Sequence, residues 1–403
     1  MKNYLEEIER NNLFVSKNLE KLKNRKILLR IDTNSSIKDG KLDLDSFKLS
    51  IFSSVLKEYV RCGALPILIT HQGRKGKDDF VANLKPLAER MEELTGIKVN
   101  YIDEIAGKKV ESSLKDLKSG EALMLRNVRD YPDETECKTL DEMLNSTLTI
   151  FFKKKVDFFV NDALSVCHRN HLSVIAFPRI LPYFFGLQLE KELRILYELI
   201  ESMKNGKGII FFVGGKKLNK LNYFENILNH PKTKFYTGGL IGQCIAYAAG
   251  VKFNQENKKL LGKTNVEKAK ILLRKFKGRI LYPVDFILDS GEVVSKDELY
   301  KSHGIIMDIG PETLDFYSKK EEYFFVFSGT MGVFEKGFDS TLKLFKRLAS
   351  KKSIILGGHS STAIFQDKPT YKKLIKKGGK ILTSGGAALV LLAGEKMPGL
   401  EIT

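Results

Sequence analysis

The sequence predicts an α/β fold built from two doubly wound parallel sheets. Short apolar runs of strand length recur along all 403 residues, and they are continuous rather than alternating. Continuous runs are typical of parallel strands that are covered on both faces. Helix-like segments lie between them, for example residues 46–60 and 339–349. About a dozen strands are too many for one compact sheet, so we expect the chain to form two domains.

The expected strands fall into two sets, one in each half of the chain. In the first half they are 26–32, 65–71, 98–103, 121–127 and 157–163. In the second half they are 208–215, 234–239, 280–288, 304–310, 324–330, 353–360 and 380–386. Such strand–helix–strand repetition indicates Rossmann-like domains, in which ligands bind at the carboxyl ends of the strands.

A boundary between the two domains is expected near the middle of the chain. Pro182 and Gly186 precede a long amphipathic stretch that ends at Asn205 and Gly206, which predicts a connecting helix with a hinge. The expected parts are an N-terminal domain over 1–180, the connecting helix over 181–206, a C-terminal domain over 207–384 and a closing segment over 385–403.

The composition is that of an ordinary globular protein. Hydrophobic residues make up 43% and charged residues 29%, which excludes a collagen-like, mucin-like or mostly disordered chain. No apolar run approaches the roughly 18 residues of a membrane-spanning helix, and the N-terminal stretch lacks the apolar core of a signal peptide. The four cysteines show no paired spacing, so we expect free thiols in a reducing cytosol rather than disulfides or a zinc cluster.

The net charge is the unusual feature of the composition. Subtracting 49 acidic residues from 67 basic residues gives +18, which suits an anionic partner such as nucleic acid or a phosphorylated metabolite. The lysines are spread along the whole chain between hydrophobic segments. This distribution favours a solvated lysine-rich surface over a dedicated nucleic-acid stripe.

The predicted strands of the first half end in a set of polar and cationic side chains. These are Arg30, Asp32, Asn34, His71, Arg74, Arg129, His168, Arg169 and His171. Arginine binds phosphate and carboxylate groups bidentately, so this rim suits a small phosphorylated acid. The alternative, that each arginine is an ordinary surface residue, stays open for any single one and is less favoured for the whole set.

The predicted strands of the second half end in glycines instead. These are Gly214–Gly215, Gly238–Gly239, Gly310, Gly329, Gly357–Gly358 and Gly385–Gly386. Glycine lets backbone amides approach a ligand closely, and a following helix offers its N-terminus to phosphate. One such turn is weak support, because glycine commonly closes strands, but six on one edge favour a nucleotide. The pair Lys216–Lys217 would then bring charge to its phosphates.

Ten segments, taken in order, carry a resemblance to a known family. They are 30–42, 70–80, 123–134, 160–173, 214–219, 283–288, 307–313, 328–335, 356–363 and 383–401. Together they resemble the phosphoglycerate kinase family over essentially the whole chain, and HQGR, GGH and the SGGA ending resemble its archaeal branch.

The resemblance implies that the first domain binds 3-phosphoglycerate. Asp32 and Asn34 would contact its hydroxyl and carboxylate groups, while its phosphate and carboxyl end would be held by His71, Arg74, Arg129 and Arg169. The closing segment 385–403 would return to this domain.

The resemblance also implies a nucleotide site in the second domain. Lys217 matches the lysine that follows the transferring phosphoryl group, Glu335 the acid that accepts the ribose hydroxyls, and Gly385 and Gly386 a helix start facing the transferred phosphoryl. The full implied set is Gly214, Gly215, Lys217, Gly238, Gly239, Glu335, Gly358, His359, Ser360 and Ser361.

The implied activity is a reversible transfer of phosphate between Mg-ATP and the carboxylate of 3-phosphoglycerate, giving 1,3-bisphosphoglycerate and ADP. Lys217, Gly385 and Gly386 would be the catalytic residues, and closure about the connecting helix would join the two half-sites. The magnesium ion would be carried by the nucleotide, with no protein metal site. The implied location is the cytoplasm, with no membrane partner.

Several positions depart from the family pattern. Phe47 stands where the family carries an arginine that bridges the acceptor and the transferring phosphoryl; Ser328 and Thr330 replace the usual Asn and Pro, and Ser360 replaces an Asp. Lys48 is adjacent to Phe47, but neighbours on a helix point about 100° apart, so it is not an automatic substitute. These departures leave open an alternative, a catalytically impaired relative that serves as a binding or regulatory protein.

Overall fold

The structure consists of two compact units. The computed structural model describes residues 2–38, 41–319, 324–349 and 353–402, apart from the side chains of Lys38 and His359. One unit comprises Met1–Tyr197 together with Lys396–Thr403, and the other comprises Glu198–Glu395. Each unit contains a six-stranded parallel sheet, which confirms the predicted fold class.

The sheet of the first unit has the strand order β5-β6-β4-β1-β7-β8, and every neighbouring pair is parallel. The strands are β1 (Lys26–Arg30), β4 (Leu65–Ile69), β5 (Lys98–Ile102), β6 (Glu121–Leu125), β7 (Phe158–Asn161) and β8 (Tyr183–Phe185). The chain builds outward from β1 in both directions, so β1 and β7 flank the point at which the strand order reverses. Open α/β sheets bind ligands at such a point.

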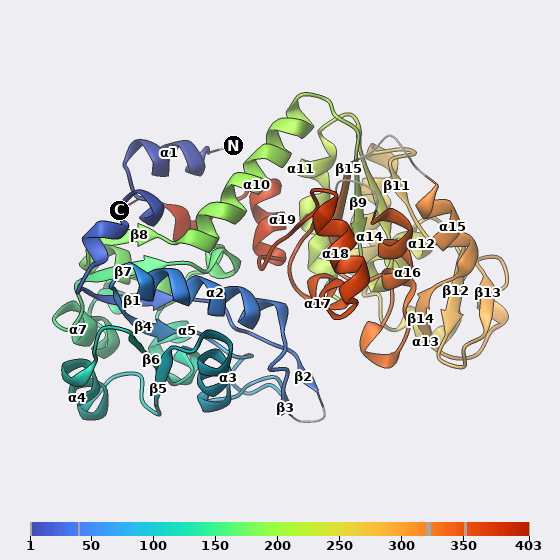
Figure 1. Ribbon diagram of the computed structural model, residues 1–403. Coiled ribbons are helices and arrows are strands. Elements are labelled where there is room, and N and C mark those ends of the chain that lie inside the picture. Colours follow the sequence, from blue (N-terminus) through green and yellow to red (C-terminus); the bar gives the residue numbers. More distant parts are fainter. Residues whose placement is uncertain (1, 39–40, 320–323, 350–352, 403) are drawn as a thin grey trace. The chain divides into compact units, whose positions relative to one another are not determined.

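Helices cover both faces of this sheet (Figure 1). Helices α2 and α3 pack their apolar sides on one face, and α4, α7, α8 and α9 pack theirs on the other. The bounds are α1 (Tyr4–Arg10), α2 (Phe47–Arg61), α3 (Lys85–Thr95), α4 (Lys108–Asp116), α5 (Asp133–Glu136), α6 (Leu140–Leu144), α7 (Thr147–Lys153), α8 (Leu172–Ile175) and α9 (Phe177–Ile180). A short hairpin, β2 (Ile37–Lys38) and β3 (Lys41–Leu42), precedes α2.

Helix α2 begins where its sequence provides a cap. Ser46 is the N-cap residue, and its hydroxyl accepts a hydrogen bond from the backbone amide of Leu49. Leu49, Phe52 and Leu56 recur at helical spacing and are buried, so one stripe of the helix faces the core. This cap fixes which side chains at the start of α2 point inward and which point toward the end of β1.

The sheet of the second unit has the strand order β11-β10-β9-β15-β16-β17, again parallel throughout. Its strands are β9 (Ile209–Val213), β10 (Thr233–Thr237), β11 (Ile280–Leu281), β15 (Phe324–Ser328), β16 (Ser353–Ile355) and β17 (Lys380–Ile381). The strand order reverses between β9 and β15. Stacked and edge-on rings, such as Phe212 and Phe327 with centroids 4.7 Å apart, fill the core beside these two strands.

The helices of the second unit also lie on both faces of its sheet (Figure 1). They are α11 (Phe224–Leu228), α12 (Gly239–Ala248), α13 (Gln255–Lys258), α14 (Lys263–Lys275), α15 (Pro311–Ser318), α16 (Ser340–Leu348), α17 (His359–Gln366), α18 (Lys368–Lys376) and α19 (Gly386–Leu392). Within the described residues, no helix is both long and apolar enough to cross a membrane.

Two predicted strands of the second half are placed differently from expectation. The run 280–288 is not one strand, because Pro283 lacks the amide that a central strand donates. It divides into β11 and β12 (Asp285–Leu288), and β12 pairs antiparallel with β13 (Val293–Ser295) and β14 (Ile306–Ile309) in a separate three-stranded sheet. The run 304–310 therefore also lies outside the parallel sheet.

Helix α10 (Leu187–Lys204) contains the boundary between the two units. The segment before it, expected to belong to the connecting helix, instead supplies β8 to the first sheet. The C-terminal residues that belong to the first unit are Lys396–Thr403, whereas α19 belongs to the second unit. The returning segment is thus shorter than the expected range 385–403.

Candidate active site

In the first unit, polar residues follow four neighbouring strands. Asp32 comes after β1, His71 after β4, Arg129 after β6 and Arg169 after β7. The carboxyl ends of parallel strands lie along one edge of a sheet, so the topology brings these predicted residues to one edge.

Asp32 lies at the centre of this edge and is almost fully buried, with 1% of its surface exposed. Its Oδ2 atom accepts a hydrogen bond from Lys48 Nζ at 2.5 Å and another from the Ser165 hydroxyl. Burial by itself would raise the pKa of Asp32, but the charges and hydrogen bonds of its neighbours hold that pKa well below its usual range. The carboxylate is therefore ionised at neutral pH.

Arg30 is fully buried behind the edge and orients His71. Its Nε atom donates to the Ser173 hydroxyl at 3.1 Å, and its Nη2 atom lies 3.2 Å from His71 Nδ1. An arginine can only donate, so Nδ1 accepts and the proton of the neutral imidazole sits on Nε2. The Ser173 hydroxyl in turn donates to Glu134 at 2.8 Å, which closes a buried polar network.

Two histidines of this edge, His71 and His171, are neutral and add no positive charge to it. Burial lowers the pKa of His71 well below its usual value, and the charges of Arg129 and Arg30 add to that effect. Burial and neighbouring arginines lower the pKa of His171 to about 3. The positive charge of the edge therefore comes from arginine and lysine side chains.

Arg129 is buried, and one of its hydrogen-bond donors has no acceptor in the part of the chain that the structure describes. Only 5% of its surface is exposed, one of its terminal nitrogens donates to the Gly73 carbonyl, and its Nε atom has no acceptor among the described residues. Burial, Arg30 and Arg169 lower the pKa of Arg129 to about 10, which leaves it charged at pH 7. A buried, charged donor without an acceptor is costly unless an anion completes it.

Arg169 and Arg74 are close enough for their charges to interact. Burial lowers the pKa of Arg169, and the charge of Arg74 lowers it further. Arg74 is exposed, and its backbone amide is fixed by Asp79 at 3.1 Å. Asn34 accepts a hydrogen bond from the Gly73 amide at 2.8 Å, so it positions the loop that carries Arg74.

In the second unit, the glycines after β9 and β10 allow three backbone segments to pack closely. A Cβ atom on Gly214 would lie 2.0 Å from the Thr330 carbonyl oxygen, and one on Gly238 would lie 2.7 Å from the Met331 sulfur. The amides of Gly214, Gly215, Gly238 and Gly239 all donate to backbone carbonyls within the unit. These glycines are thus required by close packing, and their amides are not the free donors expected from the sequence.

Lys217 is exposed just after this glycine pair, at the N-cap of the 3₁₀ helix η5 (Leu218–Tyr223). Lys220, which the sequence analysis did not single out, is more deeply buried and is close enough to feel the charge of Lys217. Lys220 Nζ donates to the carbonyls of Gly214 and Ser328, each at 2.9 Å, across the point where the strand order reverses. The only sequence signal was a third lysine in GGKKLNK.

The remaining predicted nucleotide residues follow β15, β16 and β17. Ser360 is fully buried and donates to the Leu356 carbonyl, and Ser361 donates to the Gly358 carbonyl, so both hydroxyls are committed internally. Gly358 is exposed and precedes α17, whereas the side chain of His359 is outside the described residues. Glu335 is exposed on the 3₁₀ helix η7 (Phe334–Lys336).

Gly385 and Gly386 begin α19 after β17. A Cβ atom on Gly385 would lie 2.4 Å from the Gly357 carbonyl, while one on Gly386 would meet open space. Their amides make no hydrogen bond within the described residues, as is usual for the first turn of a helix.

The chain is similar in sequence and structure to known proteins of one family. A family model described as phosphoglycerate kinase matches residues 17–395. The chain is 34% identical over 393 residues to a phosphoglycerate kinase of Thermococcus sibiricus, with 93% of each chain covered, and 32% identical to that of Pyrococcus furiosus, with 94% of each covered. It is similar to the crystal structure of the Pyrococcus horikoshii phosphoglycerate kinase, with a TM-score of 0.80, 30% identity, and coverage of 94% of this chain and 96% of that one.

The chain belongs to the phosphoglycerate kinase family. Phosphoglycerate kinases are ATP-dependent kinases, and the archaeal names among the relatives agree with the HQGR, GGH and SGGA segments. None of these likenesses favours the alternative of a catalytically impaired binding protein.

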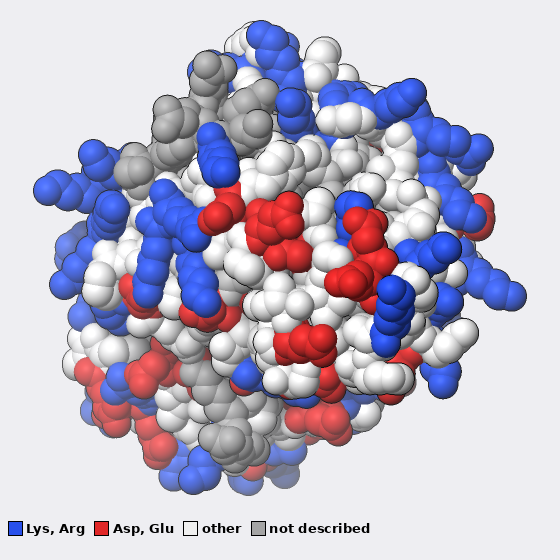
Figure 2. All heavy atoms as spheres, turned by 90° about the vertical axis from the view of Figure 1, so that its right-hand side faces the viewer, with Lys and Arg blue, Asp and Glu red and all other residues white. Residues whose placement is uncertain are grey.

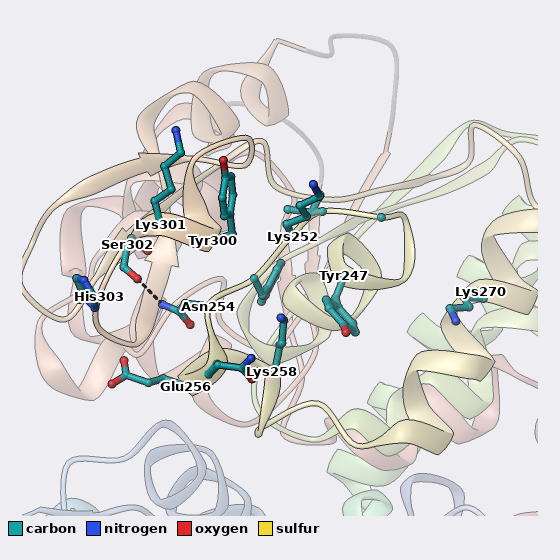
Figure 3. Close-up of a pocket in the computed structure, with 14 residues that line it drawn as sticks. Tyr247, Lys252, Asn254, Glu256, Lys258, Lys270, Tyr300, Lys301, Ser302 and His303 are labelled. Carbon is teal, nitrogen blue, oxygen red and sulfur yellow. Dashed lines mark hydrogen bonds between the residues drawn. The ribbon is translucent and has the colours of Figure 1, made fainter.

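A hollow in the second unit has none of the predicted nucleotide residues of that unit among its lining residues. It has a volume of about 790 Å³ and includes Tyr247, Lys252, Asn254, Tyr300 and Lys301 among its lining residues (Figure 3). Helix α12 begins at Gly239 and reaches this hollow near its other end, roughly 15 Å away along a ten-residue helix. The lysine side chains labelled in Figure 3 do not converge on one point, so no phosphoglycerate kinase substrate is assigned here.

The excess positive charge does not form a continuous stripe on the face that carries β12 and β13. Figure 2 shows acidic side chains between the lysines and arginines on this side of the second unit. The pattern is that of a mixed solvated surface, as expected from the spread of lysines along the sequence.

Proposed function

We propose that this chain transfers the γ-phosphoryl group of Mg-ATP to the carboxylate of 3-phosphoglycerate and catalyses the reverse reaction. A carboxylate oxygen attacks the γ-phosphorus in line, a new P–O bond forms, and the bond to the β,γ-bridging oxygen breaks. The products are 1,3-bisphosphoglycerate and ADP. Such a transfer depends mainly on positioning and on neutralising the oxygens of the moving group.

The main support for binding of the acidic substrate comes from Arg129. Its buried guanidinium retains an Nε donor without an acceptor among the described residues, so an anion bound at the strand edge would complete it. Arg169 and Arg74 would bind the phosphate with it, and the neutral His71 would donate one hydrogen bond from Nε2. Asp32 and Asn34 would contact the hydroxyl and carboxyl groups.

The nucleotide would bind at the glycine-rich strand ends of the second unit. Lys217 would follow the phosphoryl group during transfer, and the free amides of Gly385 and Gly386 would donate to its oxygens. Glu335 would accept the ribose hydroxyls, and Gly358 would let the loop before α17 approach the phosphates. Because Ser360 and Ser361 are hydrogen-bonded internally, we assign them to holding that loop rather than to direct contact.

Magnesium would arrive as part of the nucleotide substrate. No group of three or more histidine, cysteine, aspartate or glutamate side chains suited to a metal ion exists within the described parts of the chain. Lys216 and Lys217, beside the glycine turn, would bind the phosphates of a nucleotide that already carries Mg²⁺. We further propose a cytoplasmic location, since Cys62, Cys137, Cys167 and Cys244 are all free thiols.

The test is ADP formation in the presence of Mg-ATP, with and without 3-phosphoglycerate. The proposal requires turnover that depends on 3-phosphoglycerate and is lost when magnesium is chelated. An enzyme that binds both substrates but produces no ADP would instead support a binding or regulatory role.

A further inference from the structure

At the start of α2, the side chain that points to the substrate edge is Lys48. Phe47, which stands where the family carries an arginine, does not point there. Phe47 is the first residue of the helix and is 3% exposed. Lys48 is the next residue, and its side chain turns toward the carboxyl end of β1, where Nζ lies 2.5 Å from Asp32 Oδ2. Neighbours on a helix diverge by about 100°, so only one of the two can point to this edge.

Lys48 differs from Arg30 and Arg129, the two buried arginines of the edge, in how freely it can move. Arg30 is fully buried and holds Ser173 and His71, and Arg129 is anchored on the Gly73 carbonyl. The side chain of Lys48 is 16% exposed and has Asp32 as its partner. A lysine ammonium on a four-carbon stem can exchange one oxygen partner for another with a small displacement.

A cation is needed at this place for an electrostatic reason. Asp32 is ionised and almost completely buried, and the acceptor substrate brings a carboxylate and a phosphate to the same edge. Like charges at close range in a buried site repel strongly unless a cation lies between them. The γ-phosphoryl group is also anionic, so the attacking oxygen needs a cation in the transition state as well.

We propose that Lys48 is a catalytic residue that binds the acceptor carboxylate and accompanies it onto the γ-phosphoryl group. The proposal rests on the function proposed above. In the substrate-free protein the ammonium is held by Asp32; with the acid bound, it bridges Asp32 and the acceptor oxygen. Lys48 forms no covalent bond, and the bonds made and broken are those of the phosphoryl transfer alone.

Three variants test this role. Lys48→Gln removes the charge, Lys48→Arg keeps a charge of different shape, and Lys57→Gln removes an exposed charge from the same helix. We expect Lys48→Gln to lower kcat by about 10²-fold or more, as is common when one transition-state donor is lost. Lys48→Arg should keep kcat within about tenfold of the parent, and Lys57→Gln should leave it unchanged.

Comparing the change in kcat with the change in KM for 3-phosphoglycerate shows whether Lys48 acts in catalysis or only holds Asp32 in place. If Lys48 only holds Asp32 in place, Lys48→Gln will raise the KM for 3-phosphoglycerate while kcat stays within about threefold, and the proposal is overturned. Thermal unfolding of each variant shows whether the fold survives. Should Lys48→Gln not fold, the decision passes to Lys48→Arg: a kcat within tenfold supports the proposal, and a loss of 10²-fold or more contradicts it.

The parent enzyme distinguishes this inference from the proposed function. If the parent shows no turnover with 3-phosphoglycerate, both the proposed function and the proposed catalytic role of Lys48 are wrong. If the parent turns over and Lys48→Gln is equally active, the kinase function stands and only the role of Lys48 is wrong.

Discussion

Lys220 Nζ donates a hydrogen bond to the carbonyl oxygen of Gly214, 2.9 Å away, at the point where the second sheet reverses its strand order. A second bond reaches Ser328 on the neighbouring strand, also at 2.9 Å. Burial of the amine and the charge of Lys217 lower the pKa of Lys220 to about 7. The neutral amine has two protons, and each can be donated to one of the two carbonyl oxygens, Gly214 and Ser328.

This arrangement predicts proton uptake when a nucleotide binds. At pH 8 most Lys220 amines are neutral in the free protein, because the pKa lies near 7. Anionic phosphates close to the amine favour its charged form and raise the pKa, so binding of Mg-ADP should take up a proton. Calorimetry in buffers of different ionisation enthalpy measures this uptake.

Two lysine variants provide the comparison for that experiment. Lys220→Met should abolish most of the uptake, while Lys216→Met, which removes an exposed lysine from the same segment, should retain it. Equal uptake in the parent and in Lys220→Met would show that another group titrates.

The same lowered pKa affects stability. Between pH 7 and about 10 the unfolded chain binds a proton at Lys220 that the folded protein does not bind, so this residue makes stability rise with pH over that range. Urea unfolding of the parent should therefore show a larger gain from pH 7 to 9 than Lys220→Met does. A smaller gain in the parent would contradict the assigned sign.

Lys217→Ala should reduce kcat strongly and change nucleotide affinity much less. A lysine that follows the moving phosphoryl group binds most tightly in the transition state, which is the signature of differential binding. Steady-state kinetics together with an ADP binding measurement separate the two effects. A kcat within about twofold of the parent would make Lys217 a surface lysine beside a glycine turn.

Arg74→Ala should raise the KM for 3-phosphoglycerate about tenfold or more and leave the KM for ATP nearly unchanged. A charge-assisted contact to phosphate contributes about 1.5–3 kcal/mol, although the exposure of Arg74 places it toward the lower end. Varying each substrate at saturation of the other provides the two constants. Equal effects on both would remove Arg74 from the acid-binding site.

Phe47→Arg should destabilise the protein without increasing its activity. Phe47 is 3% exposed, so an arginine there must either bury its charge or leave a void, at a cost of about 3 kcal/mol. The midpoint of urea unfolding reports the loss. A variant of unchanged stability with a higher kcat would show that position 47 faces the substrate, and Lys48 would then not replace the family arginine.

The sequence was sufficient for features that depend on local pattern. Continuous apolar runs predicted the strands, and the residues that follow them, such as Asp32 and Arg129, predicted the polar edge of the first sheet. The ordered motifs predicted the family. These signals succeed because a parallel sheet brings every strand end to the same edge, whatever the loops between them do.

Features that depend on packing could not be predicted. The neutral state of His71 follows from burial beside Arg30, and the direction of Lys48 follows from the cap at Ser46 and the burial of Phe47. The glycine amides were expected to be free, but their use in close backbone packing depends on Thr330 and Met331, far away in sequence. Pro283 limits how far a strand can extend in the run 280–288, but the separate antiparallel sheet depends on pairing of β12 with β13 and β14.

The most direct test of the account is the identity of the product. Incubation of the enzyme with Mg-ATP and 3-phosphoglycerate in hydroxylamine converts an acyl phosphate into a hydroxamate, which can be quantified alongside ADP. Transfer to the carboxylate predicts one hydroxamate for each ADP, and no ADP when 3-phosphoglycerate is omitted. ADP accompanied by inorganic phosphate without hydroxamate, or no ADP at all, would contradict it.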